Sequence, residues 1–248
     1  MRQNPNTARF WDRKIGGVSR IPKGDWVTRD RLYSIISFIP DNEGELLDVG
    51  LGYGFLEDFL QRKRKKVKVI GIDLSSTAVK QARKFFDGHF LVGISQSLPI
   101  QDSTFDYVCL LEVLEHLYRK DAMHSLNEAR RVLKLHGRLI VSVPLFDHVY
   151  HGHPSGHVRM YFPARLISEL DRSGFRVIDR KFLYAFSNFY FIKNLVNGIL
   201  KFRRPNNLIV VAEKKDRTDR TDKMVKKEKT DKKNEKDQGD KGNRGMKK

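Results

Sequence analysis

The sequence lacks the features that mark secreted and membrane-spanning proteins. No apolar run among its 248 residues reaches the roughly 18 residues that a membrane-spanning helix requires. Residues 1–14, MRQNPNTARFWDRK, lack the apolar core of a secretory signal. A single cysteine, Cys109, excludes an intramolecular disulfide framework and a cysteine-based zinc cluster. We therefore expect a cytoplasmic protein with one domain large enough for a full hydrophobic core.

Positive charge is abundant but unevenly distributed. The formal net charge is +18, and residues 214–248 hold 15 Lys or Arg against 8 Asp or Glu. Because this tail has almost no apolar residue to bury, we expect it to be disordered. Two interpretations stay open for the tail: a solubilising extension with no partner, or a weak electrostatic attraction to RNA or an anionic membrane.

Short runs rich in Val, Ile and Leu alternate with amphipathic segments from Leu46 onward, which predicts an α/β fold with helices on both faces of a mostly parallel sheet. The expected strands are residues 45–50, 66–73, 89–93, 105–111, 137–144, 175–183 and 207–213. The expected helices are residues 28–38, 55–64, 76–86, 121–133 and 163–172. Cys109 falls in the middle of a strand, so we expect a buried hydrophobe and not a nucleophile.

Three glycines at every second position follow the first strand, in LLDVGLGYGFL. Glycines between a strand and a helix permit positive φ and let a ligand approach the backbone. A dinucleotide turn would carry its third glycine where this chain has Phe55, so the spacing disfavours nicotinamide and flavin dinucleotides. Asp48 stands near the turn to attract an ammonium group, and Asp73 ends the next strand where it could accept hydrogen bonds from both hydroxyls of a ribose. The pattern indicates a nucleoside that bears a cation.

Four segments in order resemble the class I methyltransferases that use S-adenosylmethionine, within them the type 11 or ubiquinone-biosynthesis-like group. The segments are DVGLGYG, GIDLSSTAV, SLPIQDSTFDYVCLLEVLEHL and EARRVLKLHGRLIVSVP. The resemblance covers about residues 44–180 and implies a seven-stranded Rossmann-like sheet of order 3-2-1-4-5-7-6, with the last strand antiparallel. We divide the chain into an N-terminal cap segment at 1–43, a methyltransferase domain at 44–213 with an apolar insertion at 185–206, and the tail.

The resemblance also implies a binding site for S-adenosylmethionine around the glycine turn. Asp48, Gly50 and Gly52 would line the methionine end of the cofactor. Gly54 would begin the helix, and Asp73 would hold the ribose hydroxyls.

The adenine side departs from the family pattern. Leu74 would pack on the adenine, and Leu111 is a further expected cofactor residue. Family members commonly carry an aspartate that accepts from the adenine amino group, and the matching position here is Ile94. Either Ser95 or a backbone carbonyl takes over, or cofactor affinity is lower, or the domain is a non-catalytic binding module.

Candidate groups for a methyl acceptor follow the fourth and fifth strands, where open sheets bind ligands. They are Glu112, Glu115, His116, Asp147, His148, His151, His153 and His157. His116 lies in the segment VLEHL, and HVRMYF is similar to a family segment that shapes the acceptor pocket. We therefore name His116, His157 and Tyr161 as catalytic candidates. The loop histidines could hold a divalent metal, but the acidic residues that such an ion needs are not evident, so we expect none.

We expect an S-adenosylmethionine-dependent methyltransferase that acts on oxygen or carbon of a small, lipophilic acceptor. The apolar insertion is interpreted either as a lid over the core or as an interfacial helix that contacts a membrane through residues 186–204. The alternatives are methylation of RNA or protein with the tail supplying affinity, and the non-catalytic module.

Overall fold

The computed structural model describes residues 6–16, 26–41, 43–146, 155–184 and 204–216. Contacts divide the chain into one compact unit, Met1–Lys214, and a second unit, Lys215–Lys248. The helix expected in the apolar insertion lies almost wholly outside the described residues, as do Asp147 and the loop histidines His148, His151 and His153. The domain boundaries expected from the sequence stay predictions.

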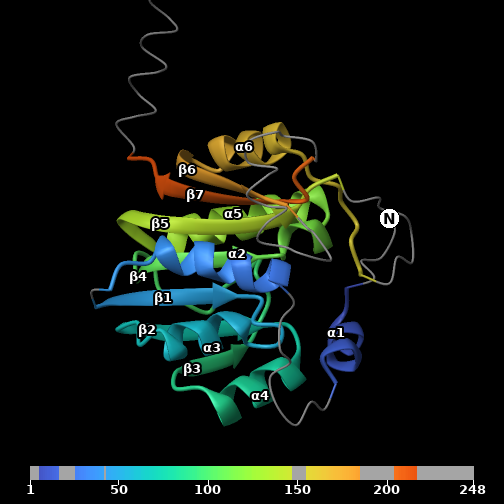
Figure 1. The fold of residues 1–248 in the computed structure, drawn as a ribbon, viewed down its shortest axis with the longest axis vertical. Coiled ribbons are helices and arrows are strands. Elements are labelled where there is room, and N and C mark those ends of the chain that lie inside the picture. The colour runs from blue at the N-terminus through green and yellow to red at the C-terminus, as the bar shows by residue number, and fades with distance from the viewer. Residues whose placement is uncertain (1–5, 17–25, 42, 147–154, 185–203, 217–248) are drawn as a thin grey trace, which may run out of the picture. The chain divides into compact units, whose positions relative to one another are not determined.

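A seven-stranded sheet in the order β3-β2-β1-β4-β5-β7-β6 forms the centre of the first unit (Figure 1). The strands are β1 (Gly44–Val49), β2 (Val67–Asp73), β3 (His89–Val92), β4 (Phe105–Leu111), β5 (Leu133–Pro144), β6 (Phe175–Leu183) and β7 (Asn207–Lys214). Pairs from β3 to β5 are parallel, and β7 is antiparallel to both β5 and β6. The predicted order and the antiparallel strand are confirmed.

Some of the helices have capping residues that the sequence predicted. The helices are α1 (Ala8–Ile15), α2 (Trp26–Ser37), α3 (Phe55–Arg62), α4 (Ser76–Phe85), the short 3₁₀ helix η1 (Leu114–His116), α5 (Arg119–Val132) and α6 (Pro163–Arg172). The Ser75 hydroxyl accepts a hydrogen bond from the Ala78 amide and caps α4. Pro163 opens α6, and Gly174, with φ of 80°, follows it. None of the helices in the described ranges combines the length and apolarity needed to cross a bilayer.

Both faces of the sheet are covered, so its central strands are buried. On one face α2 and α3 pack through Leu32, Ile35, Leu56 and Leu60, and on the other α5 and α6 pack through Leu126, Ala129, Leu166 and Leu170. Figure 1 shows α2 in front of the sheet and α5 behind it. Burial of each such leucine contributes about 1.5–3 kcal/mol. The carboxyl ends of β1, β2 and β4 are therefore held on a rigid base.

Cys109 is fully buried in β4, opposite Asp48 of β1. Its burial, together with the neighbouring acids Asp48 and Glu57, raises the pKa of its thiol well above the ordinary value. The predicted role as a small buried hydrophobe is confirmed.

Strand β5 is longer than the sequence indicated, because it begins at Leu133 and not at Gly137. Leu133 pairs with Phe105, and the register then shifts before Tyr107 pairs with Arg138. His136 takes a positive φ of 62° within this irregularity. Polar residues in the first part of β5 interrupt its apolar pattern, so a prediction from hydrophobicity missed this part of the strand.

Candidate cofactor and acceptor site

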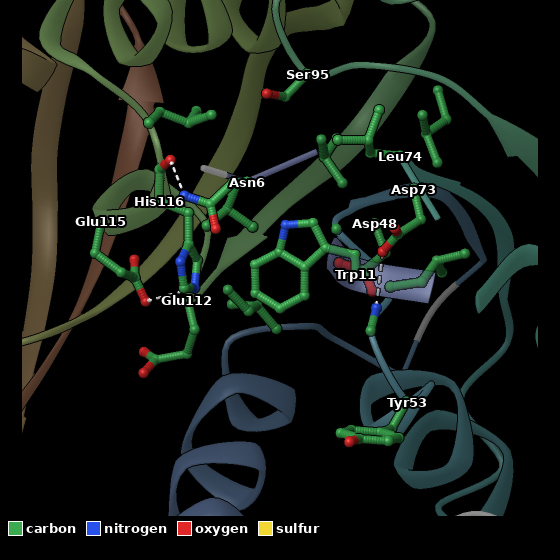
Figure 2. Close-up of a pocket in the computed structure, with 18 of the residues that line it drawn as sticks. Asn6, Trp11, Asp48, Tyr53, Asp73, Leu74, Ser95, Glu112, Glu115 and His116 are labelled. Carbon is green, nitrogen blue, oxygen red and sulfur yellow. Dashed lines mark hydrogen bonds and ion pairs between the residues drawn. The ribbon is translucent and has the colours of Figure 1, made fainter. Parts of the chain in front are cut away.

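A cavity of about 380 Å³ lies at the carboxyl ends of β1, β2 and β4 (Figure 2). Small-molecule sites typically measure about 300–1,000 Å³. Most residues predicted for the site line this cavity: Asp48, Gly50, Gly52, Asp73, Leu74, Ile94, Ser95, Leu111, His116 and His157. Gly54 and Tyr161 are not among the lining residues. The structure thus brings residues from five separate sequence segments to one place.

The glycines of the turn differ in what surrounds them. Gly52 has φ of 55°, and a Cβ added there would meet no atom within 4 Å, so its backbone faces open space. Gly54 has φ of 75°, and its added Cβ would lie 2.4 Å from the Phe86 ring. Gly52 can therefore receive a ligand against its backbone, whereas Gly54 lets the chain turn into α3 against a packed ring.

The carboxylate of Asp73 is held in a fixed orientation at the end of β2. Its Oδ2 accepts a hydrogen bond from the Gly52 amide at 2.9 Å, and its Oδ1 accepts from the Ser75 amide at 2.7 Å. Burial raises the pKa of Asp73, while the two amide hydrogen bonds act to lower it. Each oxygen keeps a further lone pair, so the group can accept hydrogen bonds from two neighbouring hydroxyls of a ligand.

A second acid, which sequence patterns did not single out, faces Asp48. Glu57 lies in the first turn of α3, and both carboxyl groups are only 3% exposed. Burial and the facing acid raise the pKa of Asp48 well above its usual range, and burial raises that of Glu57 to about 7. Asp48 lines the cavity, so a cationic ligand there would lie beside Asp48, with Glu57 behind it.

The adenine side of the predicted site holds two polar side chains beside exposed Ile94. The Ser95 hydroxyl lies 2.7 Å from that of Ser125 and donates to Gln96 Oε1 at 3.2 Å. Both Ser95 and Gln96 line the cavity. Gln96 was missed from the sequence, because it lies in a loop whose course depends on contacts with α5.

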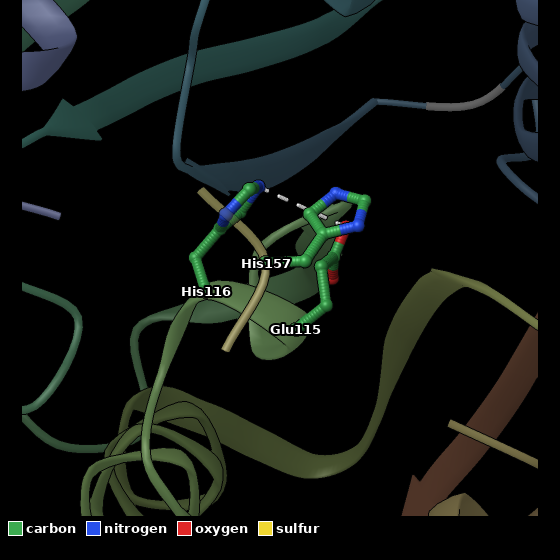
Figure 3. A group of neighbouring side chains, drawn as sticks. All are labelled: Glu115, His116 and His157. Atoms are coloured by element: carbon green, nitrogen blue, oxygen red, sulfur yellow. Dashed lines mark ion pairs between the residues drawn. The ribbon is translucent and has the colours of Figure 1, made fainter. Parts of the chain in front are cut away.

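Glu115, His116 and His157 form the opposite wall of the cavity (Figure 3). The two imidazole rings have centroids 4.8 Å apart, and a nitrogen of His116 lies 4.0 Å from a Glu115 carboxylate oxygen. Backbone bonds fix the wall, because the Glu115 carbonyl accepts from the amides of Val158 and Arg159. Burial lowers the pKa of His116 to about 3, so its imidazole is neutral at physiological pH.

The same three side chains fit a metal ion poorly. Bonds of about 2.0–2.1 Å in tetrahedral geometry bring ligand atoms to about 3.3–3.4 Å of one another, whereas these lie up to 4.8 Å apart. The Lys14 ammonium also acts on this wall: burial lowers the pKa of Lys14, and the negative charge of Glu115 opposes that shift only in part. The Lys14 charge adds to the effect of burial in lowering the pKa of His116. The expected absence of a metal stays a prediction.

Tyr161, the third catalytic candidate, belongs to a buried network. It is fully buried, and its hydroxyl donates to Glu169 Oε2 at 2.9 Å. The other oxygen of Glu169 pairs with Arg159. Tyr161 therefore helps to hold the segment that carries His157, and the structure does not bring its hydroxyl to the cavity.

Helix α1 contributes residues to the cavity that the sequence could not place. In Figure 2 the Trp11 indole lies between the Asp48–Asp73 side and the Glu115–His116 side. Asp12 Oδ1 accepts from the Ser75 hydroxyl at 2.6 Å and the Thr77 amide at 3.0 Å.

The segment that carries α1 also reaches the acceptor wall. The Asn6 amide donates to the carbonyls of His116 at 3.0 Å and Gly156 at 2.8 Å, and the Lys14 ammonium donates to Ser155 at 2.8 Å. The helix is thus attached to both sides of the cavity.

Glu112, an acceptor-side candidate, forms an ion pair with Arg31 of α2 at 3.0 Å. Its other oxygen accepts from Ser142 and Asn207, each at 2.9 Å. Glu112 also takes a positive φ of 56° at the end of β4. Through these partners the Glu112 carboxylate links the end of β4 to β5, β7 and α2.

Comparison with known proteins gives consistent results. Residues 47–141 match the family described as "Methyltransferase domain". Over 137 residues the chain is 35% identical to the demethylmenaquinone methyltransferase of Thermotoga maritima. That alignment covers 54% of this chain and 59% of the relative, so less than two-thirds of the relative's length is matched.

Solved structures share the fold at low identity. A chain in the complex of the Haloferax volcanii Trm112 methyltransferase activator has a TM-score of 0.61 at 22% identity, over 77% of this chain and 90% of that one. The 1,6-didemethyltoxoflavin-N1-methyltransferase of Burkholderia thailandensis, solved with bound 1,6-didemethyltoxoflavin and S-adenosylhomocysteine, has a TM-score of 0.59 at 18% identity, over 77% of this chain and 80% of that one.

Proposed function

We propose that the protein transfers a methyl group from S-adenosylmethionine to a small acceptor, as the match of residues 47–141 to the methyltransferase-domain family supports. The observation that carries the proposal is the Asp73 carboxylate, which the Gly52 and Ser75 amides orient beside the open backbone of Gly52. Such a group suits the paired hydroxyls of a ribose.

The cofactor would lie along the glycine turn. Asp48 would face its ammonium group, Asp73 its ribose, and Leu74 its adenine, with Leu111 beside the methionine part. Ser95 and Gln96 offer hydrogen bonds where Ile94 offers none. When bound, the cofactor would supply an electrophilic methyl group on a sulfonium; the acceptor atom would bond to this carbon in line as the carbon–sulfur bond breaks and S-adenosylhomocysteine leaves.

His116 would position the acceptor and not deprotonate it. An imidazole whose pKa is about 3 stays neutral and is a weak base, but it can accept or donate one hydrogen bond. His157, the neighbouring ring, also lines the cavity and offers a second imidazole that can hydrogen-bond to the acceptor. Where the acceptor is a phenol or enol, whose proton leaves readily, orientation and exclusion of water supply most of the catalysis.

The acceptor is proposed to be planar and lipophilic. Trp11, Leu32 and Phe55 line the cavity, and they favour apolar ligands over sugars or free amino acids. The Thermotoga relative is named for action on demethylmenaquinone, which supports a quinone-like acceptor. Transfer to oxygen and transfer to carbon are both compatible with this wall.

Calorimetric titration of S-adenosylhomocysteine into the protein tests the cofactor site. Micromolar binding that Asp73→Ala abolishes is the expected result, and absence of binding to the wild type would remove the proposal. A labelled-methyl screen against lipid, RNA and protein fractions then identifies the acceptor. Label in the lipid fraction supports a lipophilic acceptor, whereas label in RNA or protein contradicts it. Co-sedimentation with anionic liposomes at low salt tests membrane contact separately.

A further inference from the structure

We infer that Glu57 shares one proton with Asp48 in the empty site and that binding of the cofactor's ammonium group releases this proton. The inference rests on the proposed function, since it concerns the methionine end of the same cavity. It assigns Glu57 a positioning role that acts through Asp48. Cofactor affinity would then depend on pH through a pair of acids beneath the glycine turn.

The geometry isolates the two carboxyl groups from other partners. Asp48 is the penultimate residue of β1 and Glu57 lies in the first turn of α3, on the two sides of the glycine turn. Within the described ranges, Asp48 Oδ1 and both Glu57 oxygens are buried without a well-formed hydrogen bond to another residue, apart from the one between the two carboxyl groups. The backbone amide of Glu57 acts on its own carboxyl group, but burial outweighs it. A proton held between the two groups satisfies both.

The surrounding charges favour retention of that proton. Asp73 of β2 adds a further negative charge near the pair, and the Cys109 thiol of β4 is neutral. The cations that line the cavity have other contacts, because Arg31 of α2 pairs with Glu112 and Lys14 of α1 donates to Ser155. Two buried carboxylates without a cation repel each other, so one of them stays protonated.

An ammonium group changes this balance. The empty site holds two carboxylate groups and the one proton that they share. After binding, both carboxylates are ionised, the ammonium supplies one positive charge in place of the shared proton, and that proton passes to solvent. No covalent bond of the cofactor forms or breaks. Below the pH at which the pair loses its proton unaided, affinity should rise up to tenfold for each unit of pH, and it should level off above that pH.

Calorimetry in buffers of low and high ionisation enthalpy, phosphate and Tris, counts the protons released when S-adenosylhomocysteine binds the full chain. At pH 6.5 we expect close to one proton for the wild type. Glu57→Gln should release almost none, because the amide can donate to Asp48 and leave it ionised. Asp58→Asn is the matched control: Asp58 is the next residue of α3 and pairs with Arg62 at the surface, so its substitution should leave the proton count unchanged.

5′-Methylthioadenosine provides a ligand control, because it keeps the adenine and ribose and lacks the ammonium. It should bind the wild type without release of a proton. Release with this ligand would assign the proton to another part of the site and would overturn the inference.

The outcomes separate this inference from the proposed function. No binding of S-adenosylhomocysteine to the wild type would remove both. Binding without proton release, or equal release by Glu57→Gln, would remove only the inference. Should Glu57→Gln not fold, difference infrared spectroscopy on the wild type gives the same answer. Loss of a protonated-carboxyl band on ligand binding supports the shared proton, and an unchanged spectrum contradicts it.

Discussion

The indole of Trp11 meets the imidazole of His116 edge-on, with ring centroids 4.7 Å apart and an angle of 85° between the planes. This contact joins α1 to the wall proposed to orient the acceptor. It also puts one of the chain's two tryptophans inside the cavity, while Trp26 is half exposed at the start of α2. The fluorescence of Trp11 should therefore respond to the cavity, and that of Trp26 to the solvent at the start of α2.

Binding of S-adenosylhomocysteine should change the fluorescence of Trp11. The ligand would replace water around an indole at the cavity wall, whereas Trp26 stays in solvent. Trp26→Phe should keep the signal and Trp11→Phe should lose most of it, as a fluorescence titration would measure. The reverse pattern would contradict the position of α1.

Asp12→Ala should weaken the hold of α1 on the cofactor side. Asp12 accepts hydrogen bonds from Ser75 and Thr77 at the start of α4, and loss of a helix-capping acceptor costs about 0.5–2 kcal/mol. We expect S-adenosylhomocysteine to dissociate about 2- to 30-fold faster, measured by stopped-flow fluorescence. Arg13→Ala, an exposed change in the same helix, is the control and should leave the rate unchanged.

Asp73→Asn should reduce affinity for S-adenosylhomocysteine by roughly 30- to 1,000-fold. Hydrogen bonds to a charged group contribute about 1.5–3 kcal/mol each, and the amide keeps only part of them. Calorimetry measures the loss, and Asp179→Asn on exposed β6 controls for the change of charge. Equal affinity in both variants would exclude Asp73 from the site.

Glu57→Gln should stabilise the empty protein at pH 8.5 and leave its stability at pH 4 almost unchanged. The folded pKa of Glu57, about 7, exceeds its ordinary value of 4.5, so the folded state binds the proton more tightly. The resulting stability is complete below about 4.5 and is lost as pH rises through 7. The Gln side chain cannot ionise, so Glu57→Gln removes the cost of ionising the buried Glu57 carboxyl group, roughly 3 kcal/mol at high pH. Thermal unfolding at the two pH values checks the sign.

His116 should make the protein sensitive to acid. The pKa of His116 is about 3 in the folded protein and 6.5 in an unfolded chain, so between these values His116 is protonated only in the unfolded chain. Stability is therefore complete above about 6.5 and falls as pH drops toward 3, by up to roughly 4 kcal/mol. His116→Gln should flatten this part of the stability profile, measured by urea unfolding between pH 4 and 7. An unchanged slope would contradict burial of a neutral imidazole.

Local signals in the sequence accounted for the sheet and for most of the helices. Helix α6 has the predicted bounds, since Pro163 and Gly174 mark its two ends. The strand order followed from motifs in sequence order, because each motif occupies the end of a known strand in the family it resembles. Strand β5 was predicted too short, since residues such as His136 interrupt its apolar pattern.

The cavity was predicted only in part, for a physical reason. Asp48, Gly52 and Asp73 were identified because they lie within or beside motif segments. Trp11 could not be placed, because α1 is attached through contacts such as that of Asp12 with Ser75, residues 63 positions apart. Glu57 has no signal of its own, since a glutamate in the first turn of a helix is common at the surface.

Because Cys109 is buried, its reaction with a thiol reagent can measure how often the core of the protein opens. It is the only thiol in the chain and it lies fully enclosed in a central strand. A thiol reagent can therefore reach it only while the sheet is open, so the rate of modification in native buffer measures how often the core opens. A ligand that binds only the closed state lowers that rate in proportion to its occupancy, and it need not be a substrate to be detected.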